Sequence, residues 1–206
     1  MEIIILAITT FFIIKKLHSI LGDESDRMYF DYENNNFKTL KEAEKVNKKN
    51  DIEGDFNYLT NEAKIYAKEI CKKIDNFSLN TFQNIAIKVM EFVIKANNNQ
   101  NKEEINKFLS KELAEVVCNS FNNEEKNNII LVSLKEAKLC DILKNGTTYD
   151  IVVLFDMEQI NYTTDKNDNI INGNKSEIVN VKERWYFSHN INSKNQTWFV
   201  NKIEEI

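Results

Sequence analysis

The chain has 206 residues, a formal net charge of −5 and 42% apolar residues. An acidic balance argues against generic nucleic-acid binding, which needs an excess of Lys and Arg. The length and apolar content suffice for one domain with its own core. Cys71, Cys118 and Cys140 are far apart and odd in number, and each lies in an apolar-periodic stretch. This pattern favours buried free thiols in a reducing compartment.

Residues 1–21 predict a membrane anchor. No charged residue occurs from Ile3 to Ile14, and Lys15 and Lys16 follow directly. As a helix this run reaches about 18 Å, which is shorter than the hydrocarbon core of a bilayer. The stretch therefore spans a membrane only if the two lysines snorkel and the apolar residues after them extend the buried surface.

An uncleaved secretory signal and a buried helix are the alternatives for this stretch. A secretory signal carries its positive charge before the apolar run, whereas Glu2 precedes this one. A buried amphipathic helix shows a polar face, and only Thr9 and Thr10 interrupt the run. Because positive flanks stay in the cytoplasm, we expect the N-terminus outside and the rest of the chain on the cytoplasmic side.

Residues 22–57 are polar and weakly patterned, and they predict a flexible tether. Three amphipathic helices are expected after it, over residues 58–74, from the N-cap Ser78 to about Asn97, and over residues 102–121. The apolar side of the last helix includes Val116.

A stripe of lysines follows one face of the first of these helices. Lys64, Lys68 and Lys72 recur at intervals of four and are candidate contacts for anionic lipid headgroups. The alternative is an ordinary solvated helix face, because Glu62 and Glu69 lie nearby.

The apolar period then changes to alternation, which predicts strands. We expect a strand over residues 129–143, a hairpin turn at Asn145-Gly146, and a second strand from Tyr149. A polar loop over 165–176, a strand around 179–187, a loop over 190–196 and a last strand over 197–203 complete the prediction. The fold class is α+β, with helices on one face of a four-stranded antiparallel meander, in a domain over residues 58–206.

Several short motifs occur in an order that resembles the bacterial Tim44-like family. They are Lys16-Leu17-His18-Ser19-Ile20-Leu21-Gly22 after the apolar run, Phe77 and Phe82 before the helix 86–96, Phe108-Leu109-Ser110, Trp185-Tyr186-Phe187, and Trp198-Phe199-Val200. The chain departs from the family pattern at the turn Asn97–Asn101 and at His189, where Arg is expected.

The resemblance implies a cone-shaped fold of the nuclear transport factor two type. It also implies association with the bacterial inner membrane through anionic lipid such as cardiolipin. In mitochondria the family's namesake is a scaffold of the import motor and links a chaperone to the channel. The tether here is too short to carry the namesake's whole chaperone-binding region.

Cone folds of this type enclose a pocket between helices and sheet. The candidate lining residues are Tyr149, Phe155, Glu183, Trp185, Trp198 and Phe199. An apolar pocket accepts an acyl chain or a peptide side chain, and plain core packing is the alternative. Glu183 is the one acid in its apolar strand row, so it is also the candidate general base if the protein is an enzyme.

Asp165, Asn167 and Asn169 are spaced like the ligands at positions one, three and five of a calcium-binding loop. Ile170 stands where that loop needs Gly, and Ser176 where it needs Glu. A hairpin loop explains these residues, so we expect no metal and no cofactor.

The sequence as a whole predicts a membrane-anchored, non-enzymatic binding or scaffold module on the cytoplasmic face of the inner membrane. It is expected to serve protein translocation or membrane-protein assembly, with anionic lipid and a membrane protein or chaperone as partners. The alternatives are a type IV secretion subunit of the VirB-eight type, with a periplasmic domain, and a pocket enzyme of the ketosteroid-isomerase-like class.

Overall fold

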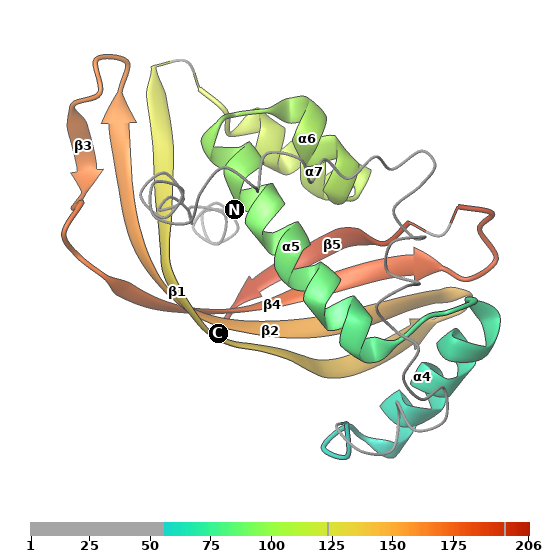
Figure 1. The fold of residues 1–206 in the computed structure, drawn as a ribbon. Coiled ribbons are helices and arrows are strands. Elements are labelled where there is room, and N and C mark those ends of the chain that lie inside the picture. Colours follow the sequence, from blue (N-terminus) through green and yellow to red (C-terminus); the bar gives the residue numbers. More distant parts are fainter. Residues whose placement is uncertain (1–55, 123, 196) are drawn as a thin grey trace, which may run out of the picture.

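The computed structural model describes residues 56–206 except 123 and 196 (Figure 1). Helices come first and strands follow, which confirms the α+β class. The helices are α4 (Asn61–Lys73), α5 (Leu79–Asn98), α6 (Lys102–Phe108) and α7 (Lys111–Asn119). The strands are β1 (Glu125–Asn145), β2 (Thr148–Asp165), β3 (Ile170–Gly173), β4 (Val179–Asn190) and β5 (Phe199–Glu205).

The expected anchor over residues 1–21 and nearly all of the expected tether over 22–57 lie outside the described residues. Among the helices of the described part, none is both long and apolar enough to cross a membrane. Phe56, the first described residue, is 2% exposed and belongs to the hydrophobic core.

Each described helix begins at a polar N-cap. Thr60, Ser78, Asn101 and Ser110 each accept a hydrogen bond from the backbone N–H three residues on. Such a cap satisfies one of the amide groups that a helix start leaves unpaired. The expected cap at Ser78 is confirmed.

The single helix expected over residues 102–121 is wrong, because the chain breaks at Leu109 and Ser110. Leu109 is extended and bridges to Val200, and the Ser110 N–H donates to the Val200 carbonyl at 2.8 Å. The Ser110 hydroxyl then caps α7. The break shifts the helical phase, so Val116, which was expected to face inward, is 45% exposed.

The sheet is antiparallel with the strand order β1-β2-β4-β5, which confirms the predicted meander. The β1–β2 turn is Asn145-Gly146, as expected, and Gly146 has φ +61°. β1 begins at Glu125, earlier than predicted. β5 runs from Phe199 to Glu205, slightly later than predicted.

The expected polar loop over residues 165–176 is partly wrong, because it contains the short strand β3. β2 extends to Asp165 and the chain turns back, so that residues 170–173 pair with Tyr162–Thr164. Gly173 allows this close return. Its φ is +74°, and a Cβ there would lie 2.3 Å from the Asn161 carbonyl oxygen.

β1 forms one edge of the sheet, and side chains of α5 bond to its backbone. The Asn98 amide both donates to the Ile129 carbonyl at 3.1 Å and accepts from the Ile129 N–H at 3.2 Å. Gln83 accepts from the Leu139 N–H at 3.1 Å. Three bulges, at Leu131/Ser133, Leu134/Glu136 and Leu139/Asp141, also interrupt this strand. Both devices protect an edge from unwanted pairing.

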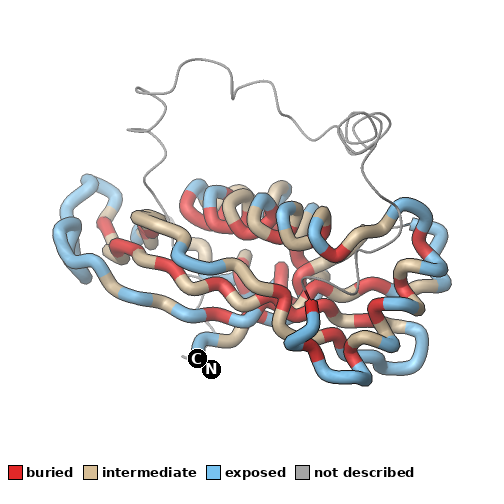
Figure 2. The backbone as a smooth tube through the Cα atoms, turned by 60° about the horizontal axis from the view of Figure 1, so that its bottom comes forward, coloured by how far each residue is buried: buried red, intermediate tan, exposed pale blue. Residues whose placement is uncertain are grey.

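The sheet is strongly curved, and two regions differ in burial. In the body, α5, α6 and α7 cover the concave face of β2, β4 and β5 (Figure 1). The arm, residues 162–178, contains the end of β2, β3 and the segment that leads to β4. It projects away from α4 and forms the exposed left end of Figure 2, where every residue from 166 to 178 is exposed.

Candidate functional site

The core of the body contains a continuous series of aromatic contacts that ends near Glu183. Trp185 contacts Phe155 edge-to-face with ring centroids 5.7 Å apart, and it stacks on Phe187 at 6.5 Å. Phe82 of α5 continues the series, 5.5 Å from Phe187 and 5.1 Å from Trp198. Such contacts add to the free energy gained from area burial alone.

Glu183 lies at the end of this series and is 0% exposed. Its Oε2 accepts a hydrogen bond from the Trp185 indole Nε1 at 2.8 Å. Its Oε1 is buried and has no hydrogen-bond partner among the described residues. On the neighbouring strands it pairs with Phe155 of β2 and Glu205 of β5.

This environment favours the protonated form of Glu183. Burial, against the lowering effect of the Trp185 hydrogen bond and with a smaller rise from the charge of Glu205, raises the pKa of its carboxyl to about 8. At neutral pH the group is therefore a neutral acid inside the core.

The structure brings only part of the predicted pocket together. Phe155, Glu183 and Trp185 are in contact, and Trp198 joins them through Phe82 and Phe187. Phe199 pairs with Ser188, one residue from the buried pair Phe187 and Val200, so it lies on the opposite face of the sheet.

Tyr149, the remaining pocket candidate, helps to hold α4 against the sheet. Its hydroxyl donates to Glu69 of α4, and the same carboxylate pairs with Lys144 at 2.6 Å. The Lys144 ammonium also lies 5.1 Å from the centre of the Tyr149 ring. The bonds from Lys144 and Tyr149 lower the pKa of Glu69, so it stays ionised.

The buried side of α4 contains small and aliphatic residues, and its opposite side is basic. Ala63, Ala67 and Ile70 are 0% exposed. Lys68 and Lys72 are exposed as predicted, whereas Lys64 is half-buried and donates to the Asn57 carbonyl at 2.9 Å. Two of the three predicted lysines are thus presented freely.

The sequence interpretation missed two exposed apolar side chains at this helix. Ile65 is 56% exposed and lies beside the two lysines on the helix circumference, about 20° from Lys72 and about 60° from Lys68. Tyr58, just before the helix, is 46% exposed, and the Lys138 ammonium lies 4.2 Å from its ring centre. Ile65 is out of phase with the apolar period, and this mismatch was the available signal. We call Ile65, Lys68 and Lys72 the α4 outer face.

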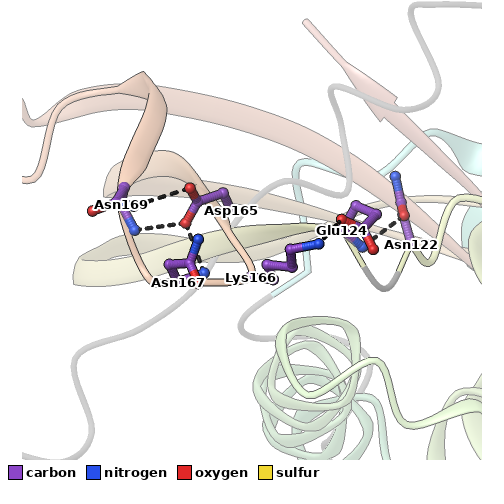
Figure 3. Close-up of polar contacts among 6 residues, drawn as sticks. All are labelled: Asn122, Glu124, Asp165, Lys166, Asn167 and Asn169. Carbon is purple, nitrogen blue, oxygen red and sulfur yellow. Dashed lines mark hydrogen bonds and ion pairs between the residues drawn. The ribbon is translucent and has the colours of Figure 1, made fainter.

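The candidate calcium residues close a hairpin turn (Figure 3). The Asp165 carboxylate accepts from the backbone N–H groups of Asn167 and Asn169 and from the Asn169 side chain, at 2.8–3.0 Å. These bonds lower the pKa of Asp165. Three amide donors on one carboxylate are the chemistry of an Asx turn, as the hairpin interpretation requires. In the described part of the chain, no three His, Cys, Asp or Glu side chains gather as a metal site.

A polar hollow of about 330 Å³ lies between this turn and the end of α5. Acidic and basic groups both line it, and Lys166 pairs with Glu124 at 2.8 Å (Figure 3). Gln100 closes one side, since its amide donates to the carbonyls of Asn122 and Glu125. The hollow therefore lacks the concentration of one charge that an ion would need.

The three cysteines form no disulfide with one another, and each is half-buried. Burial raises the pKa of the Cys118 and Cys140 thiols, which disfavours the reactive thiolate.

Comparison with known families assigns this fold. The model of the Tim44-like domain matches residues 64–205, from Lys64 in the first turn of α4 to Glu205, the last residue of β5. The chain belongs to the Tim44-like domain family. No curated protein sequence matches it. The resemblance drawn from the sequence is confirmed, and membership of the Tim44-like family indicates a binding or scaffold module associated with membrane translocation.

Proposed function

We propose that this Tim44-like protein is a membrane-anchored, non-enzymatic scaffold whose α4 outer face contacts anionic lipid. The anchor is residues 1–21, with Ile3–Ile14 in the bilayer and Lys15 and Lys16 at its cytoplasmic surface. The domain then lies in the cytoplasm, at the inner membrane, and binds a membrane protein or chaperone. The α4 outer face is the observation that carries the lipid contact.

The composition of that face suits a lipid surface. Lys68 and Lys72 are exposed, and Ile65 beside them exposes more than half of its surface. Lysines are attracted to anionic headgroups, and an apolar side chain next to them gains free energy by entering the interface. α4 is also fixed to the sheet through Glu69, Lys144 and Tyr149, so the face has a set orientation.

Two observations support a non-enzymatic role. Glu183, the one candidate general base, is 0% exposed and bonded to Trp185. A general base must come within hydrogen-bond reach of a substrate proton, and this carboxyl faces the core.

Vesicle binding by the full chain tests the lipid contact. We compare Lys68→Ala/Lys72→Ala with the matched control Lys107→Ala/Lys111→Ala, which changes two exposed lysines on α6 and α7. Each lysine near an anionic surface contributes about 1 kcal/mol, so the α4 variant should lose about 30-fold in preference for anionic over zwitterionic vesicles at low salt. The control should lose little. Equal losses in both variants would refute the α4 contact while leaving the anchor untouched.

The topology has its own test. A reporter active only in the periplasm, fused after Ile206, should be inactive, whereas a cytoplasmic reporter at the same place should be active. The opposite result would favour the secretion-subunit alternative and would place the domain outside the cytoplasm.

A further inference from the structure

The carboxyl of Glu183 is buried without a positively charged partner. It is 0% exposed, and Oε2 accepts a hydrogen bond from the Trp185 indole, whereas Oε1 has no partner among the described residues. An ionised carboxylate in this place would lose its hydration and gain one hydrogen bond in return. The closed structure therefore requires the neutral acid.

The elements around Glu183 contribute mainly apolar side chains. β2 places Phe155 opposite it, and its own row on β4 continues with Val181 and Trp185. Among the helices that cover the sheet, the buried residues of α5 are apolar except for Asn97 and Asn98 at its end. Those of α6 and α7 are Ile105, Leu113, Ala114 and Val117.

The charged and titratable groups that adjoin Glu183 in the described part of the chain include no counterion. Glu205 of β5 pairs with it across the strands and is exposed. Lys182 and Arg184 flank it on β4, and strand alternation directs both to the opposite face. From α7 the Cys118 thiol packs on the core, and burial raises its pKa, so that it stays neutral. The facing charge is therefore that of Glu205, which repels an ionised Glu183.

β5, the strand that carries Glu205, is held differently in its two halves. In the first half, the Ser110 N–H donates to the Val200 carbonyl at 2.8 Å, and Leu109 bridges to Val200. A bulge follows at Asn201, where β5 has one residue more than β4. The distal half of β5, residues 202–206, then has β4 as its one strand partner in the described part of the chain.

Besides the ladder to β4, a few contacts hold the distal half in place. The Tyr186 hydroxyl donates to Glu204, and the Ile206 N–H donates to the Lys182 carbonyl at 2.9 Å. Ile203 is 8% exposed and packs in the core. Because the bulge separates this half from the anchored half, it can open while the contacts of the first half persist.

We propose that the distal half of β5 is a pH-sensitive cover, which opens at the Asn201 bulge when Glu183 ionises and admits water to the carboxylate. Opening hydrates the charge and separates it from Glu205, so the ionised form favours the open state. None of these residues belongs to α4, so the cover does not depend on the lipid contact.

The direction of the pH effect follows from the two states. The pKa of Glu183 is about 8 when the cover is closed, and it returns toward 4.5 when the carboxyl is in water. The open state therefore binds fewer protons between these values. The equilibrium constant for opening rises by up to about tenfold per pH unit in this range and is constant above it.

Hydrogen exchange of the full chain in mild detergent tests the cover. Short fragments are read by mass spectrometry, with rates corrected for intrinsic exchange at each pH. From about pH 6 to about pH 7.5, the opening constant of residues 202–206 should rise about 20-fold in wild type and stay constant in Glu183→Gln. At each pH it should exceed that of β2 and of the fragment around Ser110 by at least about tenfold, since these require a larger opening.

A variant on the same half provides the matched control. Glu204→Ala removes the bond from Tyr186 on the opposite face, so it should raise the opening constant about fivefold at every pH and leave the pH dependence unchanged. The proposal is overturned if wild type and Glu183→Gln show the same pH dependence. It is equally overturned if residues 202–206 open no more readily than β2, because the opening is then global unfolding.

Discussion

The body and the arm are parts of one sheet with opposite relations to solvent. In the body, β2 and β4 place Phe155, Trp185 and Phe187 under α5, and all three are nearly unexposed. In the arm, the same β2 continues past the helices, and every residue of β3 is exposed (Figure 2). The difference shows that helix cover, and not strand formation, decides where this sheet gains its stability.

The largest effect is expected from Trp185→Ala in the body. The substitution removes a ring that is 1% exposed and touches two other rings, and it leaves a cavity. Large-to-small changes of this kind cost about 3–5 kcal/mol in the free energy of unfolding. Chemical denaturation measures it. Tyr162→Ala in the arm is the matched aromatic control and should cost less than half as much. Equal losses would mean that the arm is as tightly packed as the body.

Next is the pH dependence set by Glu183 in the body. Its pKa is about 8 in the folded protein and about 4.5 in the unfolded chain, so the folded state holds the proton between these values. Stability is therefore highest at low pH within this window and falls as pH rises from about 4.5 to 8. Ionisation of Glu183 lowers the free energy of unfolding by at most about 5 kcal/mol. A glutamine in its place would instead bury an unpaired amide, at a cost of about 1 kcal/mol.

Glu183→Gln removes that ionisation. At pH 9 the variant should be more stable than wild type by about 2–4 kcal/mol, and at pH 5 the two should agree within about 1 kcal/mol. Thermal or chemical unfolding at both pH values provides the measurement. A wild-type stability that does not decline between pH 5 and pH 9 would contradict the assignment of a neutral buried acid.

A smaller effect is expected where α5 protects β1. Asn98→Ala removes both bonds to Ile129 and leaves two buried backbone groups unpaired, at a cost of about 1–3 kcal/mol. Asn99→Ala changes the next residue, which is exposed, and should cost less than about 0.5 kcal/mol. If the two variants unfold alike, the amide of Asn98 does not protect the edge.

The smallest effect on folding is expected from Ile171→Ser in the arm. Half of this side chain is already in solvent, so the free energy of unfolding should change by less than about 0.5 kcal/mol. Chemical denaturation measures this change. A loss above 1 kcal/mol would show that β3 packs against the body.

The sequence was sufficient for the elements whose residues follow one period. The alternation from Tyr149 to Met157 and the Asn145-Gly146 turn predicted β2 and its hairpin, and Ser78 marked the start of α5. The sequence was insufficient where a contact with a residue distant in sequence determines the local structure. The break at Leu109 depends on Val200, and β3 depends on the continuation of β2 to Asp165.

The candidate site shows the same division. The pattern identified Glu183 as an acid in an apolar row, and its burial confirms that it belongs to that row. The pattern did not distinguish Phe199 and Tyr149 from the other predicted pocket residues. Phe199 lies on the other face of the sheet, and Tyr149 bonds to α4. Asn98 has no sequence signal of its own, because it lies within a run of asparagines. Its two hydrogen bonds to the backbone of Ile129 are visible in the structure alone.

The two amide bonds from α5 to β1 also have a geometric consequence. Gln83 and Asn98 are separated by a helical length of about 22 Å. Their partners Leu139 and Ile129 are separated by about 33 Å of strand when it is fully extended. The two anchoring points are thus closer together on the helix than along a fully extended strand, which fits a β1 that bends over α5. Two of the three bulges of β1 lie between these points and contribute to the bend. The spacing of two amides on one helix is therefore matched to the course of the strand that it covers.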